Sequence, residues 1–88
     1  MFDKESAKEA LKEALENVLG ESVGKLNFDM RMFEDLHMDS TTMLESLLEL
    51  EEKLGFDIDP EELDMEDFLT VNAYTEFLVQ SVREKEND

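Results

Sequence analysis

The sequence predicts an all-α fold: a small four-helix bundle with three longer helices, one short third helix and a long first loop. Several stretches place apolar residues three or four positions apart, which is the spacing of an amphipathic helix. The 88 residues suffice for one domain, 1–88, near the size at which a single core only just offsets chain entropy. Cysteine is absent, so packing alone must stabilise this core.

The first helix is predicted over residues 4–19. Its apolar positions follow the three-and-four spacing and are Ala7, Ala10, Leu11, Ala14, Leu15, Val18 and Leu19. Lysines and glutamates occupy the opposite side, so this helix is amphipathic. Gly20 follows the last apolar residue, as is typical of a helix C-terminus.

An extended loop is predicted from residue 21 to residue 39. Within it, "LNFDMRM" at 26–32 alternates apolar and polar residues like a half-buried strand. The only other strand candidate, "FDID" at 56–59, is too short to form a stable pair with it. We expect function near the end of this loop. We also expect its apolar residues to hold it against the helices, namely Leu26, Phe28, Phe33 and Leu36.

The second helix is predicted over residues 40–54. It opens after "DS" or "DSTT", whose short polar side chains can accept hydrogen bonds from the first free backbone amides. Gly55 ends it. One stripe of this helix is predicted to enter the core and consists of Met43, Leu47, Leu50 and Leu54.

Two more helices complete the predicted bundle. Pro60 suits the first position of a short helix over 60–66. Thr70 can cap a final helix over 70–83. The polar tail at 84–88 is expected to be disordered.

The net charge of the chain limits the classes of molecule that it can bind. Asp and Glu number 25 against eight Lys and Arg, which gives a formal net charge of −17. This charge argues against binding to nucleic acid or to an anionic membrane surface, and favours basic proteins or cations. No stretch approaches the roughly 18 consecutive apolar residues of a membrane span. We therefore expect a cytoplasmic monomer.

Ser40 has two interpretations from the residues alone. His37 and Asp39 are close in sequence, yet Ser40 lacks the G-x-S-x-G pattern of a strand-to-helix nucleophile, so we expect no catalytic residue here. The simpler interpretation is that Ser40 caps the second helix.

A calcium loop is the other chemistry that the acidic residues suggest. "DIDPEELDMEDF" at 57–68 begins with Asp57, Asp59 and Glu61 at the first, third and fifth positions of an EF-hand loop. Its sixth position is Glu62 instead of glycine, and its twelfth is Phe68 instead of glutamate. We expect no dedicated metal site, only weak and diffuse binding of divalent cations.

Leu44 and Leu48 lie beside the core stripe of the second helix, among several glutamates. They could be apolar anchors of an interface with a charged rim. They could also form the edge of a wide core stripe, which periodicity alone favours.

The sequence resembles the acyl carrier proteins. The resemblance lies in "FEDLHMDSTTMLESLLELEEKLGFDIDPEEL" and "FLTVNAYTEFL" and, with the first helix, covers nearly the whole chain. In that family an Asp-Ser-Leu motif at the start of the second helix carries the serine to which a transferase attaches a 4′-phosphopantetheine arm from coenzyme A. Asp39 and Ser40 match the motif, so the resemblance implies that Ser40 is the attachment site. A serine of this kind needs no built-in base, because a separate enzyme activates it.

The resemblance also implies a binding role without catalysis. A phosphopantetheinyl transferase would first attach the arm, and the carrier would then present its thioester-bound acyl group to acyltransferase or ketosynthase-type enzymes with basic docking surfaces. Met43, Leu47 and Leu50 would lie near a sheltered acyl chain. The residues implied in partner docking are Asp39, Thr41, Leu44, Glu45, Leu48, Glu51 and Glu52.

Three positions depart from the family pattern. Thr41 replaces the leucine after the serine, His37 stands where glycine is usual, and Ser46 occupies a position that is often apolar. These departures argue against a housekeeping carrier of fatty-acid synthesis. The "FEDLHMDS" and "MLES" stretches resemble discrete carriers of polyketide-type pathways, which favours a specialised carrier. Two alternatives stay open: an aminoacyl or peptidyl carrier, and an acidic interaction module of the same fold that is not modified.

Overall fold

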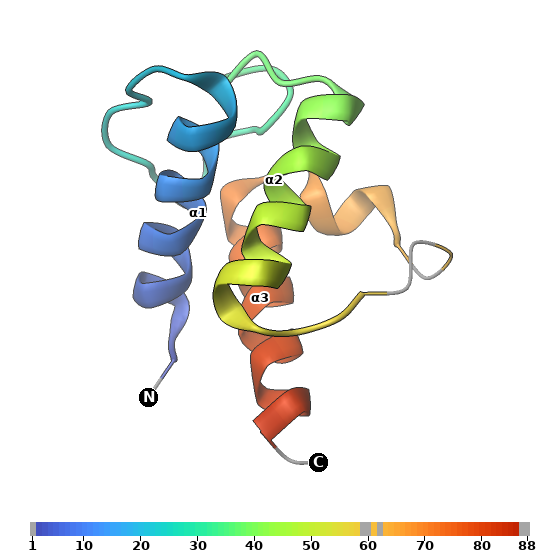
Figure 1. Ribbon diagram of the computed structural model, residues 1–88. Helices are drawn as coiled ribbons and strands as arrows, with labels where there is room; N and C mark the ends of the chain where they lie inside the picture. The colour runs from blue at the N-terminus through green and yellow to red at the C-terminus, as the bar shows by residue number, and fades with distance from the viewer. Residues whose placement is uncertain (1, 59–60, 62, 87–88) are drawn as a thin grey trace.

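The computed structural model describes residues 2–58, 61 and 63–86 (Figure 1). The elements with described bounds are three α-helices and a 3-10 helix, and Glu61 also has 3-10 helical conformation. These elements are α1 (Lys4–Leu19), α2 (Ser40–Leu54), the 3-10 helix η2 (Met65–Phe68) and α3 (Val71–Glu86). The fold is therefore all-helical over the described part of the chain, as predicted.

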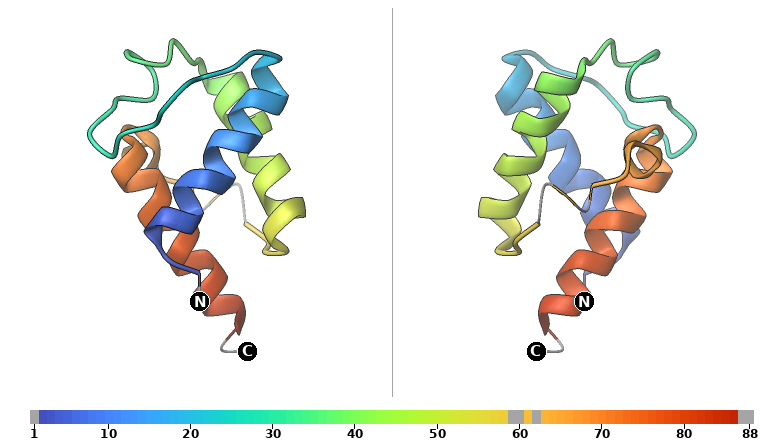
Figure 2. Two further views of the ribbon diagram at one scale, coloured as in Figure 1. Left: turned by 90° about the vertical axis from the view of Figure 1, so that its left-hand side faces the viewer. Right: turned by 90° about the vertical axis from the view of Figure 1, so that its right-hand side faces the viewer.

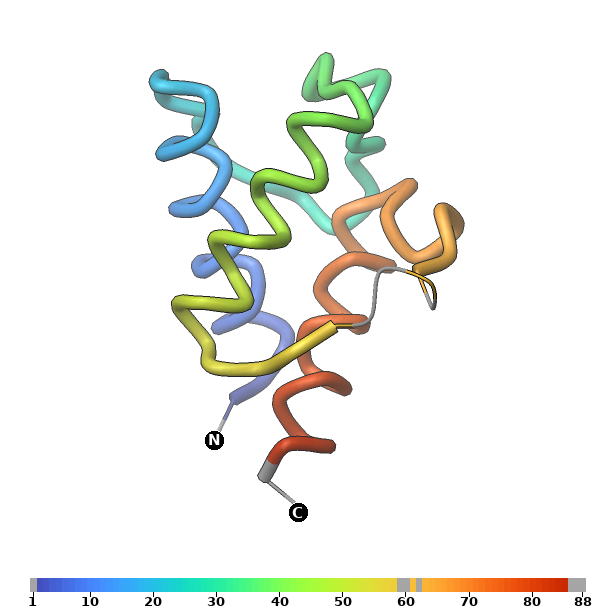
Figure 3. Tube along the Cα trace, turned by 45° about the vertical axis from the view of Figure 1, so that its right-hand side comes forward, coloured from blue at the N-terminus to red at the C-terminus, as the bar shows by residue number. Residues whose placement is uncertain are grey.

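The three α-helices pack side by side, with α1 running against the direction of α2 and α3 (Figures 1 and 2). Both ends of the chain lie at one end of the molecule, and the start of α2 lies at the other (Figure 1). After α2 the chain passes across α3 before it reaches η2, and Phe56 is buried in this passage (Figure 3). This arrangement presents the first turn of α2 well away from both termini.

The helices meet in one apolar core. Phe68 of η2 and Tyr74 of α3 are fully buried, with ring centroids 5.0 Å apart in an edge-to-face arrangement. Such pairs add to the stabilisation from burial, so they fix η2 against α3. The buried apolar residues of the long helices include Ala7, Ala10, Leu11, Ala14, Leu15, Met43, Leu47, Leu50, Val71, Leu78, Val79 and Val82.

The first loop is tied to the start of α3 by backbone hydrogen bonds. Met32 N donates to Leu69 O (2.9 Å), Val71 N to Met30 O (2.9 Å) and Asn72 N to Phe28 O (2.8 Å). The alternating segment at 26–32 thus does pair with another segment, but with 69–72 rather than 56–59. The pairing is limited to one isolated antiparallel bridge, between Arg31 and Thr70. The segment therefore remains a loop.

Side chains of this loop reach the core as expected. Leu26 is buried, whereas the expected anchors Phe28, Phe33 and Leu36 are partly buried and pack against the core. Lys4 and Lys8 of α1 place their ammonium groups 4.9 and 4.7 Å from the centre of the Phe28 ring, which adds cation–π attraction.

The short third helix differs from the prediction. Residues 59, 60 and 62, which belong to the predicted 60–66 helix or its approach, lie outside the described residues. Glu61, within the predicted range, has 3-10 helical conformation, and a 3-10 helix with described bounds follows at Met65–Phe68. It begins there because the Asp64 carboxylate accepts a hydrogen bond from Glu66 N (3.0 Å), and Phe68 is drawn into the core.

The end of the chain differs as well. Thr70 caps α3 as expected, since its Oγ1 accepts from Ala73 N (3.0 Å). However, α3 continues to Glu86, so residues 84–86 are helical and not disordered, while 87–88 lie outside the described residues. Val82 is buried near this end, and Arg83 and Lys85 place positive charge in the last turn, where the helix dipole favours it.

A buried hydrogen bond joins α2 to α3. Ser46 Oγ donates to Met43 O (2.7 Å), which leaves Tyr74 OH to donate to Ser46 Oγ (3.1 Å), and both side chains are fully buried. Burial raises the pKa of the Tyr74 hydroxyl, so it remains protonated and able to donate. The unusual serine of α2 is therefore the partner of a core tyrosine.

We expect Ser46→Ala to cost about 1–3 kcal/mol, because it leaves the Tyr74 hydroxyl buried without a partner. Tyr74→Phe should cost less, about 0.5–1.5 kcal/mol, since Ser46 keeps its bond to Met43 O. Urea unfolding of both variants and of the double variant measures these values. The double variant should cost less than the sum, and strictly additive costs would contradict the pairing.

Candidate functional site

Asp39, and not Ser40, caps the N-terminus of α2. Its backbone is extended (φ −110°, ψ 177°), and its carboxylate accepts a hydrogen bond from Thr42 N at 2.7 Å. Its carbonyl oxygen accepts from Met43 N at 3.0 Å. These are the two bonds of an N-cap residue. Ser40 is the first helical residue, so the interpretation of Ser40 as the cap is wrong.

The Ser40 side chain is exposed at this end of the molecule. Its hydroxyl forms no hydrogen bond with any described residue, because the cap role is taken by its neighbour. Ser40 therefore has a free hydroxyl group, on a rigid element, that another protein can reach.

No base within the described chain is arranged to activate Ser40. The Asp39 carboxylate is bound to Thr42 N and does not orient His37. His37 is exposed and has φ +54°, in the left-handed region that glycine adopts most readily. Histidine tolerates this region better than most residues, which explains how it replaces the glycine usual among acyl carrier proteins.

The Asp39 carboxylate is held in its charged form. The hydrogen bond from Thr42 N lowers its pKa below the ordinary value, and the Thr42 side chain adds to this effect. A negative charge at a helix N-terminus is also favoured by the helix dipole. Ser40 thus has a permanent anion as its immediate neighbour at neutral pH.

One flank of α2 combines exposed leucines with carboxylates. Leu44 is 43% and Leu48 64% exposed, so the interpretation that they form the edge of the core is wrong. At about 100° of rotation per residue, the two leucines share this flank with three other exposed residues, Thr41, Glu45 and Glu52. We call these five residues the α2 flank. It adjoins Ser40 along the helix surface.

Glu51, which was expected to take part in partner docking, has another role. It is partly buried, and its carboxylate accepts a hydrogen bond from Ile58 N at 3.3 Å. It therefore holds the chain that follows α2 and is less available to a partner.

Two exposed apolar residues near η2 were not singled out from the sequence. Met65 is 48% and Leu69 47% exposed. Their spacing of four residues within an acidic stretch could have indicated a shared exposed face. This face was missed because the predicted helix ended at residue 66, before Leu69.

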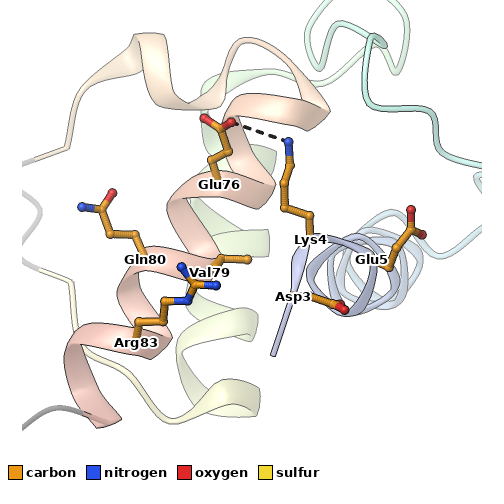
Figure 4. Close-up of a pocket in the computed structure, with 7 residues that line it drawn as sticks. All are labelled: Asp3, Lys4, Glu5, Glu76, Val79, Gln80 and Arg83. Carbon is orange, nitrogen blue, oxygen red and sulfur yellow. Dashed lines mark ion pairs between the residues drawn. The ribbon is translucent and has the colours of Figure 1, made fainter. Parts of the chain in front are cut away.

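A hollow of about 710 Å³ lies away from Ser40, at the end of the molecule that holds both termini (Figure 4). The start of α1 and the second half of α3 form its walls, where Lys4 and Glu76 make an ion pair at 3.6 Å. Its other lining residues are charged or polar except Val79.

The described residues contain no group of three potential metal ligands. Of the rejected calcium loop, Asp59 and Glu62 lie outside the described residues, and Phe68 belongs to the core. None of the helices in the described ranges has the length and apolar character needed to cross a bilayer.

We expect Asp39→Ala to destabilise the fold at neutral pH, since Thr42 N loses its partner, and Asp39→Asn to destabilise it less, because asparagine retains an acceptor. The pKa of Asp39 is lower in the folded state than in the unfolded state. The charged cap therefore stabilises the fold at pH values above the unfolded-state pKa. This stabilisation is lost as the pH falls through the folded-state pKa. Thermal unfolding across acidic pH measures this trend. A difference between wild type and Asp39→Ala that stays constant down to the lowest pH would disagree with it.

Comparisons with known proteins bear on this site. Curated proteins gave no match. The family described as "Phosphopantetheine attachment site" matches residues 9–78, which is most of the chain and includes Asp39 and Ser40. Domains of this family carry covalently attached 4′-phosphopantetheine and are in general non-catalytic carriers, in agreement with the resemblance to acyl carrier proteins. The chain belongs to the phosphopantetheine-attachment family.

Proposed function

We propose that this protein is an acyl carrier whose 4′-phosphopantetheine arm is attached to Ser40. The Ser40 oxygen attacks the phosphorus of coenzyme A that carries the pantetheine arm, and a base on the phosphopantetheinyl transferase takes the hydroxyl proton. The pyrophosphate bond of coenzyme A breaks, and adenosine 3′,5′-bisphosphate leaves. The arm ends in a thiol that holds the acyl group as a thioester. The protein itself presents this group and performs no step of the chemistry.

One observation carries the proposal. Ser40 is exposed and has no hydrogen-bond partner among the described residues, because Asp39 takes the cap role. A serine that capped the helix would have to break its bond before reacting, whereas this hydroxyl is free at the start of a rigid helix. The neighbouring loop residues leave it at the surface of the molecule, which suits attack by an external active site.

The α2 flank supports a docking role. Its carboxylates would attract basic surfaces of partner enzymes and speed the encounter. Leu44 and Leu48 would provide the apolar contacts at the centre. Thr41, beside Ser40 and in place of a leucine, would affect which transferase or synthase binds. Asp39 would place a fixed negative charge at the edge of the contact. Glu51 would act indirectly, because its carboxylate holds the chain after α2 through the hydrogen bond from Ile58 N.

The partners proposed are a phosphopantetheinyl transferase and acyltransferase or ketosynthase-type enzymes of fatty-acid or polyketide synthesis. The protein would act as a cytoplasmic monomer. The resemblance of "FEDLHMDS" and "MLES" to polyketide-type carriers, together with Thr41 in place of leucine, supports a specialised carrier. An aminoacyl or peptidyl carrier is the alternative within the same family, and the class of acyl donor that loads the modified protein separates the two.

We expect incubation with coenzyme A and a broad-specificity transferase to add the mass of one phosphopantetheine, and Ser40→Ala to abolish the addition. Intact-protein mass spectrometry measures this change. Ser22→Ala is the matched control, because Ser22 is also an exposed serine but lies in the first loop. Circular dichroism verifies that each variant is folded. An unmodified wild type with several active transferases would favour the acidic interaction module instead.

Leu44→Ala and Leu48→Ala should lower kcat/KM for modification by about tenfold, as expected when an interface anchor worth about 1.4 kcal/mol is lost. Their stability should change by less than about 0.5 kcal/mol, since both leucines are exposed. Buried Leu47→Ala is the contrast and should cost about 2–5 kcal/mol of stability. Transferase kinetics and urea unfolding measure the two effects. Unchanged kinetics in both exposed variants would remove the α2 flank from transferase docking.

A further inference from the structure

Positive charge is concentrated on one flank of α1. The chain has only eight basic residues, and Lys4, Lys8 and Lys12 follow one another at intervals of four on this helix. Residues four apart lie above one another on a helix surface, so these lysines form a stripe. Lys25 from the first loop joins the stripe, because it lines the same hollow as Lys8 and Lys12.

This hollow has a volume of about 320 Å³ and is lined by Lys8, Glu9, Lys12, Gly24, Lys25 and Leu26. We call it the lysine hollow. Lys8 is fixed at its edge, 3.3 Å from the Glu5 carboxylate and 4.7 Å from the centre of the Phe28 ring. Leu26 is buried and forms part of its base. The volume is near the lower end of the range for small-molecule sites.

Lys12 and Lys25 form no ion pair with any described residue. Arg83 and Lys85 are also without an ion pair among the described residues, whereas Lys53 pairs with Glu13 and Arg31 lies 2.6 Å from Glu34. What distinguishes Lys12 and Lys25 is that both line the same hollow. The arrangement can accept a compact external anion.

We propose that the lysine hollow binds the phosphate group of a small molecule. Lysine ammonium groups bind phosphate as point charges with several donors each. A phosphate dianion concentrates its charge on oxygens that face several directions, which suits cations that converge from α1 and from the loop. A single carboxylate could satisfy fewer of these donors.

The net charge of −17 does not prevent this binding at physiological salt. Charges more than about 8 Å away are largely screened at that ionic strength, so the groups around the hollow dominate. Those groups are three lysines and the Glu9 carboxylate, with Glu5 offsetting part of the charge on Lys8. Glu9 opposes the anion, so removal of this carboxylate should strengthen binding.

The lysine hollow is separate from the proposed attachment site. Asn17 and Glu13 of α1 contact Glu49 and Lys53 of α2, which places α2 along that flank of α1. Lys8 and Lys12 lie on the other flank, where the first loop packs. Phosphate binding therefore does not depend on Ser40, and it holds even if the proposed carrier function fails.

Amide NMR of the full chain tests the proposal, with inorganic phosphate and inorganic pyrophosphate as probes at constant ionic strength. We expect saturable shifts at residues 8–12 and 24–26, with a dissociation constant of about 1 mM. Lys12→Gln with Lys25→Gln should weaken binding about tenfold, and Glu9→Gln should strengthen it. Lys53→Gln and Ser40→Ala are the controls, and each should leave the affinity unchanged.

Three results would overturn the proposal. Shifts that rise linearly without saturation would show an ion atmosphere and no site. An equal loss of affinity in Lys53→Gln would show a general effect of net charge. Retained affinity in the folded Lys12 and Lys25 double variant would place the anion elsewhere on the molecule.

Discussion

The hydrogen bond from Thr42 N to the Asp39 carboxylate determines where α2 begins, and much of the structure follows from that position. In the helix that begins at Ser40, the apolar face formed by Met43, Leu47 and Leu50 packs into the core. The same helix leaves Leu44 and Leu48 exposed. A cap one residue later would make Ser40 the acceptor and engage the hydroxyl that we propose as the attachment point. The cap thus stabilises the helix and keeps its first residue available.

The long helices could be predicted from local patterns, whereas the contacts between distant segments could not. Spacings of three and four with a glycine at the end were sufficient to locate α1 and α2, because helix formation depends on neighbours in sequence. The pairing of the loop with 69–72 joins residues some forty positions apart, and alternation in one segment does not identify its partner. Residues 84–86 look like a frayed polar tail in sequence, but packing by Val82 and the basic last turn extend α3 through them.

The functional site also combines features that could be predicted from the sequence with features that only the fold reveals. The Asp39-Ser40 pair was found through the resemblance, but both residue types are good caps, so the sequence alone could not assign the cap. The structure separates their roles. Ser46 also looked like a departure from an apolar position, and only the fold shows that Tyr74 lies opposite it. The exposure of Leu44 and Leu48 was equally undecided, since a wide core stripe and an interface produce the same periodicity.

Charge is arranged unevenly over this acidic molecule. Carboxylates surround the exposed leucines on the α2 flank, and three lysines gather on the far flank of α1. The first arrangement can attract basic enzymes toward Ser40 and, because contacts at a charged rim are weak, still allow release. Self-repulsion among the carboxylates opposes the compact state, so a core with a fully bonded polar pair and capped helices is needed to maintain the fold.

The central claim is that Ser40 carries the arm in the cell. Trypsin cleaves after Arg31 and Lys53, so one peptide, 32–53, holds Ser40 together with Thr41, Thr42 and Ser46. Tandem mass spectrometry of this peptide, from protein isolated from its own cells, locates the modification among these four hydroxyls. We expect phosphopantetheine on Ser40. Phosphopantetheine on one of the other three residues, or a peptide that is always unmodified, would contradict it.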